Sequence, residues 1–286
     1  MTRVRTPALW HAIAEATDVL TDAGVNSPRV DAEELAAHAA GTTRGRLPLV
    51  DAPDPAVFER LADLVAARAR RVPLQHLVGT AAFGPLLLHV GPGVFIPRPE
   101  TEALLEWAAG QALPPDPVIV DLCTGSGALA IALARSMPTA RVVAVDISRD
   151  ALDYARRNAA GSRVELRLGD VCDSTLFGDF DGRVVLIVAN PPYLSDAVVL
   201  EPEVAQHDPP EALFGGPDGN DVIAAIAPLA ARWLRPGGLV AVEHDDTASR
   251  AVARIFVDTG CFEAVVPHTD FARRPRFVTA RRKAIQ

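Results

Sequence analysis

The amino-acid sequence predicts an α/β protein in which a small helical bundle precedes a seven-stranded, doubly wound parallel sheet. Short apolar runs alternate with amphipathic stretches from residue 118 onward, which is typical of parallel strands joined by helices. The first 75 residues carry helical periodicity, and a segment rich in Gly and Pro follows them. We therefore expect a helical domain at residues 1–75, a β-hairpin linker at 76–95 and an α/β domain at 96–286.

Three amphipathic stretches form the expected helical domain, at residues 7–24, 27–41 and 54–71. In the second stretch Ser27 is the predicted N-cap and Pro28 the first helical residue. No cluster of chemically reactive side chains accompanies these helices, so we interpret them as a packing or partner-docking module. The first helix is expected to bury one face, made of Leu9, Ile13, Ala16, Val19 and Leu20.

The α/β domain is expected to alternate strands and helices along the chain. The predicted strands lie at residues 118–122, 142–145, 163–168, 184–189, 239–243, 262–266 and 276–281. The predicted helices lie at residues 126–136, 149–160, 221–234 and 248–259. Sheets of this kind bind ligands outside the carboxyl ends of their strands, at the point where the strand order reverses.

Composition excludes several classes of protein. The chain has 286 residues, 49% of them hydrophobic, and a net charge of -8, which disfavours general attraction to nucleic-acid phosphates. Cys123, Cys172 and Cys261 are too few and too far apart for a disulfide framework or a zinc site. The sequence shows neither a secretory signal nor an apolar run long enough to span a membrane. We expect a cytoplasmic protein without a metal centre.

Polar residues follow the first three predicted strands of the sheet. The first strand runs into "VDLCTGSGALA", where Asp121 precedes a turn containing Gly125 and Gly127. Glycines allow such a turn to approach a ligand closely. Asp146 ends the second strand, at a distance suited to a ribose diol, and Asp170 ends the third, where it could meet an adenine amino group. These residues alone leave a dinucleotide and S-adenosylmethionine as competing ligands, although Asp121 suits the cationic S-adenosylmethionine better.

The fourth strand, "VVLIVANPPYLSD", runs into Asn190-Pro191-Pro192-Tyr193. Together with the glycine turn, this motif resembles the class I S-adenosylmethionine-dependent methyltransferases. Two stretches ahead of that core, "RRVPLQHLVGTAAF" and "VFIPRPETEALLEWA", narrow the resemblance to the peptide-chain release factor N5-glutamine methyltransferases (the HemK/PrmC family). The similarity extends from about residue 27 to the C-terminus.

This resemblance implies the activity, the substrate and the site. It implies methylation of the glutamine in the Gly-Gly-Gln motif of class-1 release factors, by a protein expected to be a monomer. The substrate would contact Asn190, Pro191, Pro192 and Tyr193, of which Asn190, Pro191 and Tyr193 would be catalytic. The cofactor, S-adenosylmethionine, would contact Asp121, Cys123, Thr124, Gly125, Ser126, Gly127, Asp146, Asp170, Val171 and Asn190. Cys123 replaces the first glycine of the family's usual turn and, because cysteine resists positive φ, we expect it to be extended or right-handed helical.

The expected chemistry explains the motif. A glutamine amide nitrogen is a poor nucleophile, because its lone pair is delocalised into the carbonyl group. The Asn190 side-chain oxygen and the Pro191 carbonyl could accept hydrogen bonds from its two N–H groups. The prolines fix the conformation of the turn, and the Tyr193 ring offers a flat surface for the planar amide. The protein would then contribute mainly alignment, without a dedicated base.

Three alternatives remain at the level of sequence. Adenine also carries a conjugated amino group, so a nucleic-acid N6-adenine methyltransferase fits the Asn-Pro-Pro-Tyr motif, although the acidic charge and "IPRPETE" disfavour it. A ribosomal-protein glutamine methyltransferase would share the same core. A binding module that has lost catalysis is disfavoured, because no expected cofactor contact and no residue of the Asn-Pro-Pro-Tyr motif is lost. The acidic run "EHDD" at residues 243–246 is interpreted as a surface or packing feature.

Overall fold

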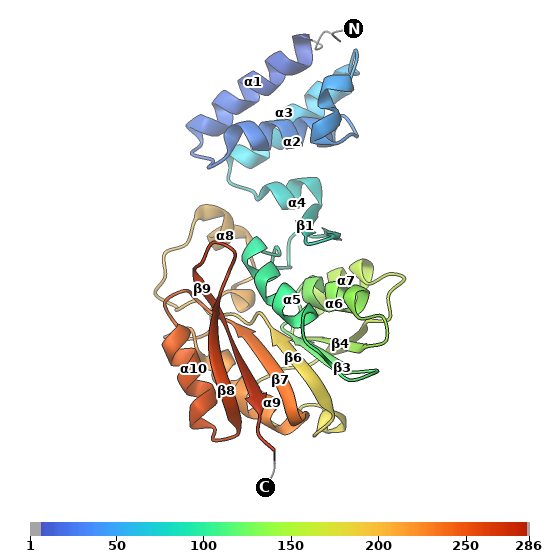
Figure 1. Ribbon diagram of the computed structural model, residues 1–286. Coiled ribbons are helices and arrows are strands. Elements are labelled where there is room, and N and C mark those ends of the chain that lie inside the picture. Colours follow the sequence, from blue (N-terminus) through green and yellow to red (C-terminus); the bar gives the residue numbers. More distant parts are fainter. Residues whose placement is uncertain (1–6, 285–286) are drawn as a thin grey trace. The chain divides into compact units, whose positions relative to one another are not determined.

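The structure, a computed structural model, describes residues 7–284, which form two compact units (Figure 1). The helical unit comprises the chain up to Thr80 together with Leu200–His207, and the sheet unit comprises Ala81–Val199 and the chain from Asp208 onward. The first six residues, part of the predicted helical domain, and the last two lie outside the described residues. No helix between residues 7 and 284 is long and apolar enough to cross a membrane.

The helical unit contains the three amphipathic helices that the sequence predicts. Its elements are α1 (Pro7–Asp22), α2 (Pro28–Ala39), η1 (Arg44–Leu49), α3 (Pro55–Ala69), α4 (Leu74–Val78) and α8 (Pro202–His207). Proline begins both α2 and α3, where its fixed φ suits the first helical turn. Asp54 caps α3 by accepting a 2.8 Å hydrogen bond from the Ala56 N–H, whereas the Ser27 side chain makes no such bond to α2.

The core of the helical unit forms between α1, α2 and α3. Leu9, Ile13 and Leu20 of α1 are fully buried in it and Ala16 nearly so, as predicted. Val19 is 46% exposed, so the buried face of α1 is narrower than predicted. A position beside an apolar stripe can remain in solvent when no neighbouring helix covers it.

A cluster of buried and partly buried charges connects α8 to the rest of the helical unit. The Arg68 guanidinium donates to Asp31 Oδ2 at 2.7 Å and to Glu203 Oε1 at 2.9 Å, and Arg71 donates to both oxygens of Glu203. Partial burial acts to raise the pKa of Glu203, but the hydrogen bonds from Arg71 and Arg68 lower it to about 2. Glu203 is therefore ionised throughout the physiological range.

The sheet unit begins with the predicted hairpin, a two-stranded sheet of β1 (Thr80–Phe83) and β2 (Leu86–His89). Its remaining helices are η2 (Pro99–Thr101), α5 (Glu102–Ala109), α6 (Ala128–Ser136), α7 (Arg149–Asn158), η3 (Gly178–Phe180), η4 (Pro210–Ala212), α9 (Asp221–Trp233) and α10 (Ser249–Asp258). Its remaining strands are β3 (Val118–Leu122), β4 (Arg141–Asp146), β5 (Glu165–Leu168), β6 (Val184–Ala189), β7 (Leu234–Glu243), β8 (Phe262–Thr269) and β9 (Pro275–Arg282).

These strands form a sheet of seven strands, among the residues described, in the order β5-β4-β3-β6-β7-β9-β8. The first five strands in this order pair in parallel, and β9 pairs antiparallel with both β7 and β8. Strand order reverses between β3 and β6, which lie side by side at the centre of the sheet. That reversal is the position where a doubly wound sheet binds its ligand.

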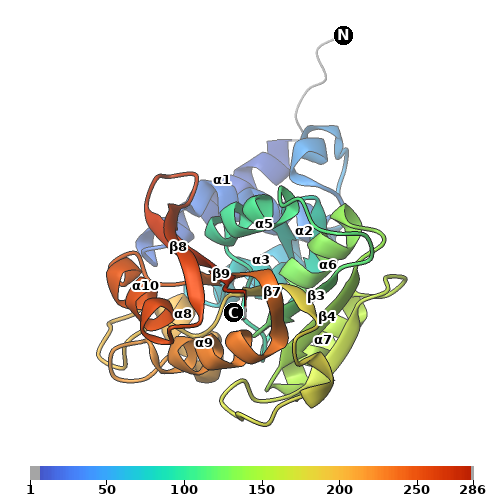
Figure 2. The same cartoon turned by 60° about the horizontal axis from the view of Figure 1, so that its bottom comes forward.

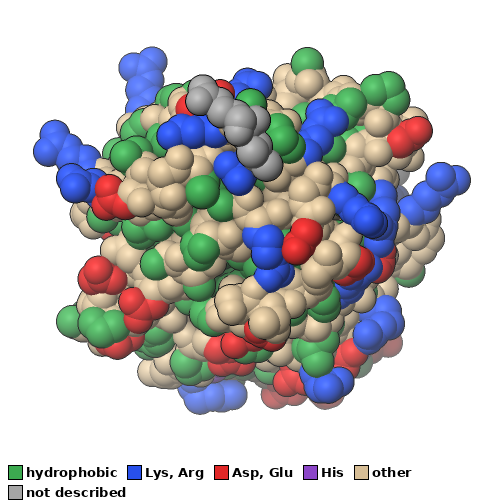
Figure 3. Space-filling view, turned by 90° about the horizontal axis from the view of Figure 1, so that it is seen from below, with side chains coloured by type: hydrophobic (Ala, Val, Ile, Leu, Met, Phe, Trp, Pro, Cys, Tyr) green, Lys and Arg blue, Asp and Glu red, His purple; other side chains and the backbone are tan. Residues whose placement is uncertain are grey.

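Both faces of the sheet are covered by helices, as Figure 2 shows. Alternate residues of β3 divide between the two faces: Val120 packs in a core with α9 and α10, and Ile119 packs in a core with α5 and α6. Burial on both sides explains why β6 is apolar along its whole length. On the surface, acidic and basic side chains are interspersed on the face shown in Figure 3.

The predicted strands at residues 118–122 and 184–189 match β3 and β6, and the other elements differ mainly at their ends. β7 starts at Leu234, before the predicted residue 239, because Leu234 pairs with Val184 across a bulge. The helices α5 and α8 were not predicted. α5 has eight residues and α8 has six, and helices this short give little periodic signal.

Candidate active site

The ends of β3 and β6 place the first two polar positions of the candidate site next to each other. Leu122, one residue beyond Asp121, pairs with Ala189, one residue before Asn190. Because the strands are parallel, their following turns open at the same edge of the sheet. The two motifs singled out in the sequence, the glycine turn and the Asn-Pro-Pro-Tyr turn, therefore flank the point where the strand order reverses.

Asp121 is a buried carboxylate in which one oxygen accepts hydrogen bonds from the protein and the other has no partner among the described residues. Its Oδ2 accepts hydrogen bonds from the Thr124 hydroxyl at 2.6 Å and from the Ala130 N–H at 3.1 Å. Its Oδ1 is buried and has no hydrogen-bond partner among the residues described. Burial raises the pKa of Asp121 to about 7, against the lowering effect of those two hydrogen bonds. Such an arrangement is costly for the protein alone and suits a ligand that carries positive charge.

The turn between β3 and α6 is held by backbone hydrogen bonds. The Thr124 N–H donates to the Val145 carbonyl at 3.0 Å, and the Gly127 N–H donates to the Thr124 carbonyl at 2.9 Å. Gly127 has φ +85°, and a Cβ there would lie 3.0 Å from Ile131 and 3.3 Å from Ala155. Gly125 has φ +56° with open space beside it, so the backbone is left accessible from the cavity.

Cys123 contradicts the conformation expected from its residue type. Its φ is +56°, in the left-handed region, rather than extended or right-handed helical. Its neighbours fix the path of the chain, because Leu122 pairs with Ala189 of β6 and the Thr124 N–H donates to the Val145 carbonyl of β4. The small thiol packs against the core that contains α9. The turn thus imposes the glycine-like conformation on a residue that pays about 1–2 kcal/mol for it.

Asp146 and Asp170 end β4 and follow β5, and both face the same cavity. Asp146 accepts the Gly125 N–H at 2.8 Å through Oδ2 and the Ser148 N–H at 2.9 Å through Oδ1. Each of its oxygens keeps acceptor capacity for a further donor such as a sugar hydroxyl. Burial raises the pKa of Asp146. Asp170 accepts the Cys172 N–H at 2.8 Å and is exposed at the cavity rim.

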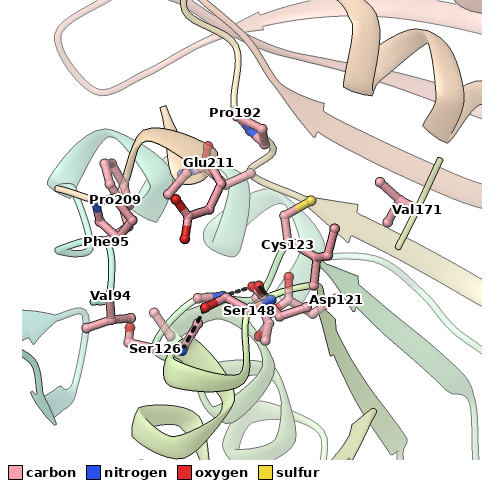
Figure 4. Close-up of a pocket in the computed structure, with 18 of the residues that line it drawn as sticks. Val94, Phe95, Asp121, Cys123, Ser126, Ser148, Val171, Pro192, Pro209 and Glu211 are labelled. Atoms are coloured by element: carbon pink, nitrogen blue, oxygen red, sulfur yellow. Dashed lines mark hydrogen bonds between the residues drawn. The ribbon is translucent and has the colours of Figure 1, made fainter. Parts of the chain in front are cut away.

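A cavity of about 340 Å³ joins these residues, within the range of small-molecule sites. It brings together most of the predicted positions, namely Asp121, Cys123, Thr124, Gly125, Ser126, Asp146, Asp170, Val171, Asn190 and Pro192. Figure 4 shows Glu211, Phe95 and Pro209 on the opposite wall from Asp121, Cys123 and Ser148. Gly127, Pro191 and Tyr193 lie outside the residues that line the cavity.

The charged side chains that line the cavity are all acidic. Four carboxylates line it, from Asp121, Asp146, Asp170 and Glu211, and no Lys, Arg or His occurs among the described residues around it. A pyrophosphate would meet repulsion there without a compensating cation, whereas a sulfonium and an ammonium group would be attracted. The carboxylates that line the cavity therefore fit S-adenosylmethionine and do not fit a dinucleotide.

The Asn-Pro-Pro-Tyr turn is held at both ends by buried polar groups. The Asn190 side-chain nitrogen donates to the Thr101 hydroxyl at 3.1 Å, and the Tyr193 hydroxyl donates to Glu243 Oε1 at 3.1 Å. Burial and the nearby Glu243 raise the pKa of Tyr193, so its hydroxyl remains a donor. Glu243 and His244 are fully buried, so the packing interpretation of "EHDD" applies to these two residues.

The wall opposite the glycine turn was not predicted from the sequence. It comes from residues 209–214, which follow α8, and from residues 94–97, which precede η2. An ion pair of 2.6 Å between Arg98 and Asp208 joins these two segments. The "IPRPETE" stretch carries Arg98, but nothing in the sequence marks Asp208, 110 residues away, as its partner.

Comparisons with known proteins agree with this geometry. Two family models match the chain: "PrmC N-terminal domain" over residues 11–79 and "Methyltransferase small domain" over residues 99–207. A protein of Mycobacterium tuberculosis named "Release factor glutamine methyltransferase" is 60% identical over 278 residues, which cover 96% of this chain and 91% of that protein. A protein of the same name from Mycolicibacterium smegmatis is 60% identical over 284 residues, which cover 99% of each chain.

A solved structure supports the fold alone. A methyltransferase from Pyrococcus furiosus is 17% identical and superimposes with a TM-score of 0.54, covering 77% of this chain and 99% of that chain.

Proposed function

This chain belongs to the family of release factor glutamine methyltransferases, and on that premise we propose how its residues perform the reaction. The protein methylates the side-chain amide nitrogen of a glutamine in release factors, with S-adenosylmethionine as methyl donor. The glutamine is proposed to be that of the Gly-Gly-Gln motif of class-1 factors. The observation that carries this function is the meeting of an acid-lined cavity with the Asn-Pro-Pro-Tyr turn at the centre of the sheet.

We propose that the cavity holds S-adenosylmethionine through its carboxylates. The free oxygen of Asp121 would accept from the cofactor's ammonium group, and Asp146 would accept from the ribose hydroxyls. Asp170 would meet the adenine amino group, and Val171 would pack against the ring. When bound, S-adenosylmethionine supplies a methyl group activated by a positively charged sulfur.

Asn190 and Pro191 are proposed to hold the substrate amide. The Asn190 oxygen and the Pro191 carbonyl would accept hydrogen bonds from the two N–H groups of the glutamine nitrogen. They would thereby stabilise the positive charge that develops on this nitrogen. Tyr193 is proposed to support this turn as well as the substrate, since its hydroxyl is already bonded to Glu243. The residues around the turn provide alignment, and the methylated nitrogen loses its proton readily to solvent.

The helical domain, residues 1–75, is proposed to recognise the body of the release factor. A single glutamine offers too little surface for selectivity, and stable recognition between proteins needs a much larger interface. We expect a short glutamine-bearing peptide to have a much lower kcat/KM than the whole factor. Equal kcat/KM values for peptide and factor would assign the helical domain a purely structural role. We further propose that the protein acts as a monomer in the cytoplasm and binds no nucleic acid.

The decisive experiment is methylation of a release factor in vitro, followed by intact-mass measurement. One methyl group should be added to the wild-type factor and none to a factor in which the Gly-Gly-Gln glutamine is replaced. Transfer to a ribosomal protein or to the adenines of DNA, with none to the factor, would contradict the assignment. Both rival substrates belong in the same assay, because each carries a conjugated NH₂ group that the turn could hold.

A further inference from the structure

Two buried residues outside the predicted site connect the ends of the Asn-Pro-Pro-Tyr turn. Thr101, at the end of η2, is 4% exposed, and Glu243, at the end of β7, is fully buried. Glu243 lies one residue beyond Val242, which pairs with Ala189, the residue before Asn190. Three segments far apart in the sequence thus converge beside Asn190.

The side-chain amide of Asn190 carries an oxygen and an NH₂ group. Only the oxygen can accept a hydrogen bond from the N–H of a substrate amide. In the structure its nitrogen donates to the Thr101 hydroxyl oxygen at 3.1 Å. The oxygen end is therefore left for other donors. A rotation of the amide by half a turn would exchange the two ends and present a donor to the substrate nitrogen.

Glu243 explains why the Thr101 hydroxyl serves as an acceptor for Asn190. When ionised, the Glu243 carboxylate only accepts hydrogen bonds, and it takes one from the Tyr193 hydroxyl at 3.1 Å. Burial raises the pKa of Glu243 to about 7, and the nearby Thr101 hydroxyl acts against this rise, as a donor to the ionised carboxylate does. When the Thr101 proton points to Glu243, its oxygen is left to accept from Asn190. Burial of Thr101 and Glu243 limits access of water that could replace these bonds.

We propose that Thr101 and Glu243 are positioning residues that fix the direction of the Asn190 amide, so that its oxygen faces the glutamine nitrogen of the substrate. This inference rests on the proposed function of Asn190. Asn190 donates to the Thr101 hydroxyl, this hydroxyl is proposed to donate to Glu243, and Tyr193 donates to Glu243 from the other end of the turn. Neither Thr101 nor Glu243 contacts the reacting atoms in this scheme.

The test combines kinetics with a double-mutant cycle. Thr101→Val should lower kcat about tenfold through the loss of one buried hydrogen bond, while calorimetry shows cofactor affinity within about twofold of wild type. Thr101→Ser should restore most of kcat, and Glu243→Gln should lower it. In an Asn190→Ala background, Thr101→Val should cause no further loss, because it acts through Asn190. Thr279→Val is a matched control, since it removes another buried hydroxyl, one bonded to His268.

A second measurement does not depend on activity. The side-chain NH₂ signal of Asn190, identified by its loss in Asn190→Ala, should exchange slowly with solvent in wild type and Thr101→Ser, and faster in Thr101→Val. Wild-type kcat in Thr101→Val, or an undiminished effect in the Asn190→Ala background, would overturn the proposal, as would unchanged exchange. A wild-type enzyme that left release factors unmethylated but showed this exchange pattern would contradict the proposed function and leave the positioning intact.

Discussion

Replacing Asp121 by Asn should make the protein without cofactor more stable and bind cofactor less well. The carboxylate is 1% exposed, its Oδ1 has no partner among the described residues, and burial raises its pKa to about 7. The ordinary value is 3.8, so the difference of about three pKa units corresponds to about 4 kcal/mol, at about 1.36 kcal/mol per unit. Asparagine can keep its oxygen toward Thr124 and Ala130 while removing the charge.

The size of this effect depends on pH. Below pH 3.8 the carboxyl group is protonated in both the folded and the unfolded chain, so Asp121 costs the folded state nothing. Between 3.8 and about 7 the unfolded chain ionises first, so the cost grows with pH, and above 7 it is fully present. Asp121→Asn should therefore raise the free energy of unfolding at pH 8, by at most about 4 kcal/mol, and have little effect near pH 4.

Two measurements check this reasoning. Denaturant unfolding at pH 8 and pH 4 gives the change in stability, and calorimetry gives the affinity for S-adenosylmethionine, which should fall by about 10- to 150-fold through the loss of a charged hydrogen bond. Serine at position 124 provides a control, since Thr124→Ser keeps the hydroxyl that donates to Asp121. A variant that is less stable than wild type at pH 8 and binds cofactor equally well would refute the argument.

Three further predictions concern other parts of the chain. Asn190→Ala should lower kcat about 10²- to 10³-fold with little change in cofactor affinity, and retention of more than about a third of kcat would reduce Asn190 to a turn former. Cys123→Gly should keep cofactor affinity, whereas Cys123→Val should destabilise the fold by about 1–2 kcal/mol because a β-branched residue resists φ +56°; equal thermal stability of the two variants would contradict this. Glu203, with a pKa of about 2 against an ordinary 4.5, should stabilise the helical unit above pH 4.5 and lose this effect as pH falls toward 2. Glu203→Gln should accordingly lower the melting temperature at pH 7 more than at pH 3, and a loss independent of pH would count against the ion pairs with Arg68 and Arg71.

The central strands could be predicted from the sequence because the signals that identify them lie in consecutive residues. Six consecutive apolar residues at 184–189, four of them β-branched, favour a short strand buried on both faces. The turns after β3 and β6 carry residues that regular structure does not need. The wall formed by Glu211 and its neighbours could not be predicted, because its place depends on the ion pair between Arg98 and Asp208. Glu243 is another such case, since a charged residue at a strand end looks the same in sequence whether solvent or Tyr193 meets it.

The helical unit described above consists of two stretches of chain, residues up to Thr80 and Leu200–His207, and this limits how it can be exchanged between relatives. A chimera that transplanted only the N-terminal stretch would place foreign side chains opposite Glu203, whose partners are Arg68 and Arg71. Loss of both guanidinium partners would leave this partly buried carboxylate unpaired and destabilise the unit. A chimera should therefore acquire the substrate preference of a relative only when both stretches come from that relative. The two stretches are accordingly expected to vary together in evolution.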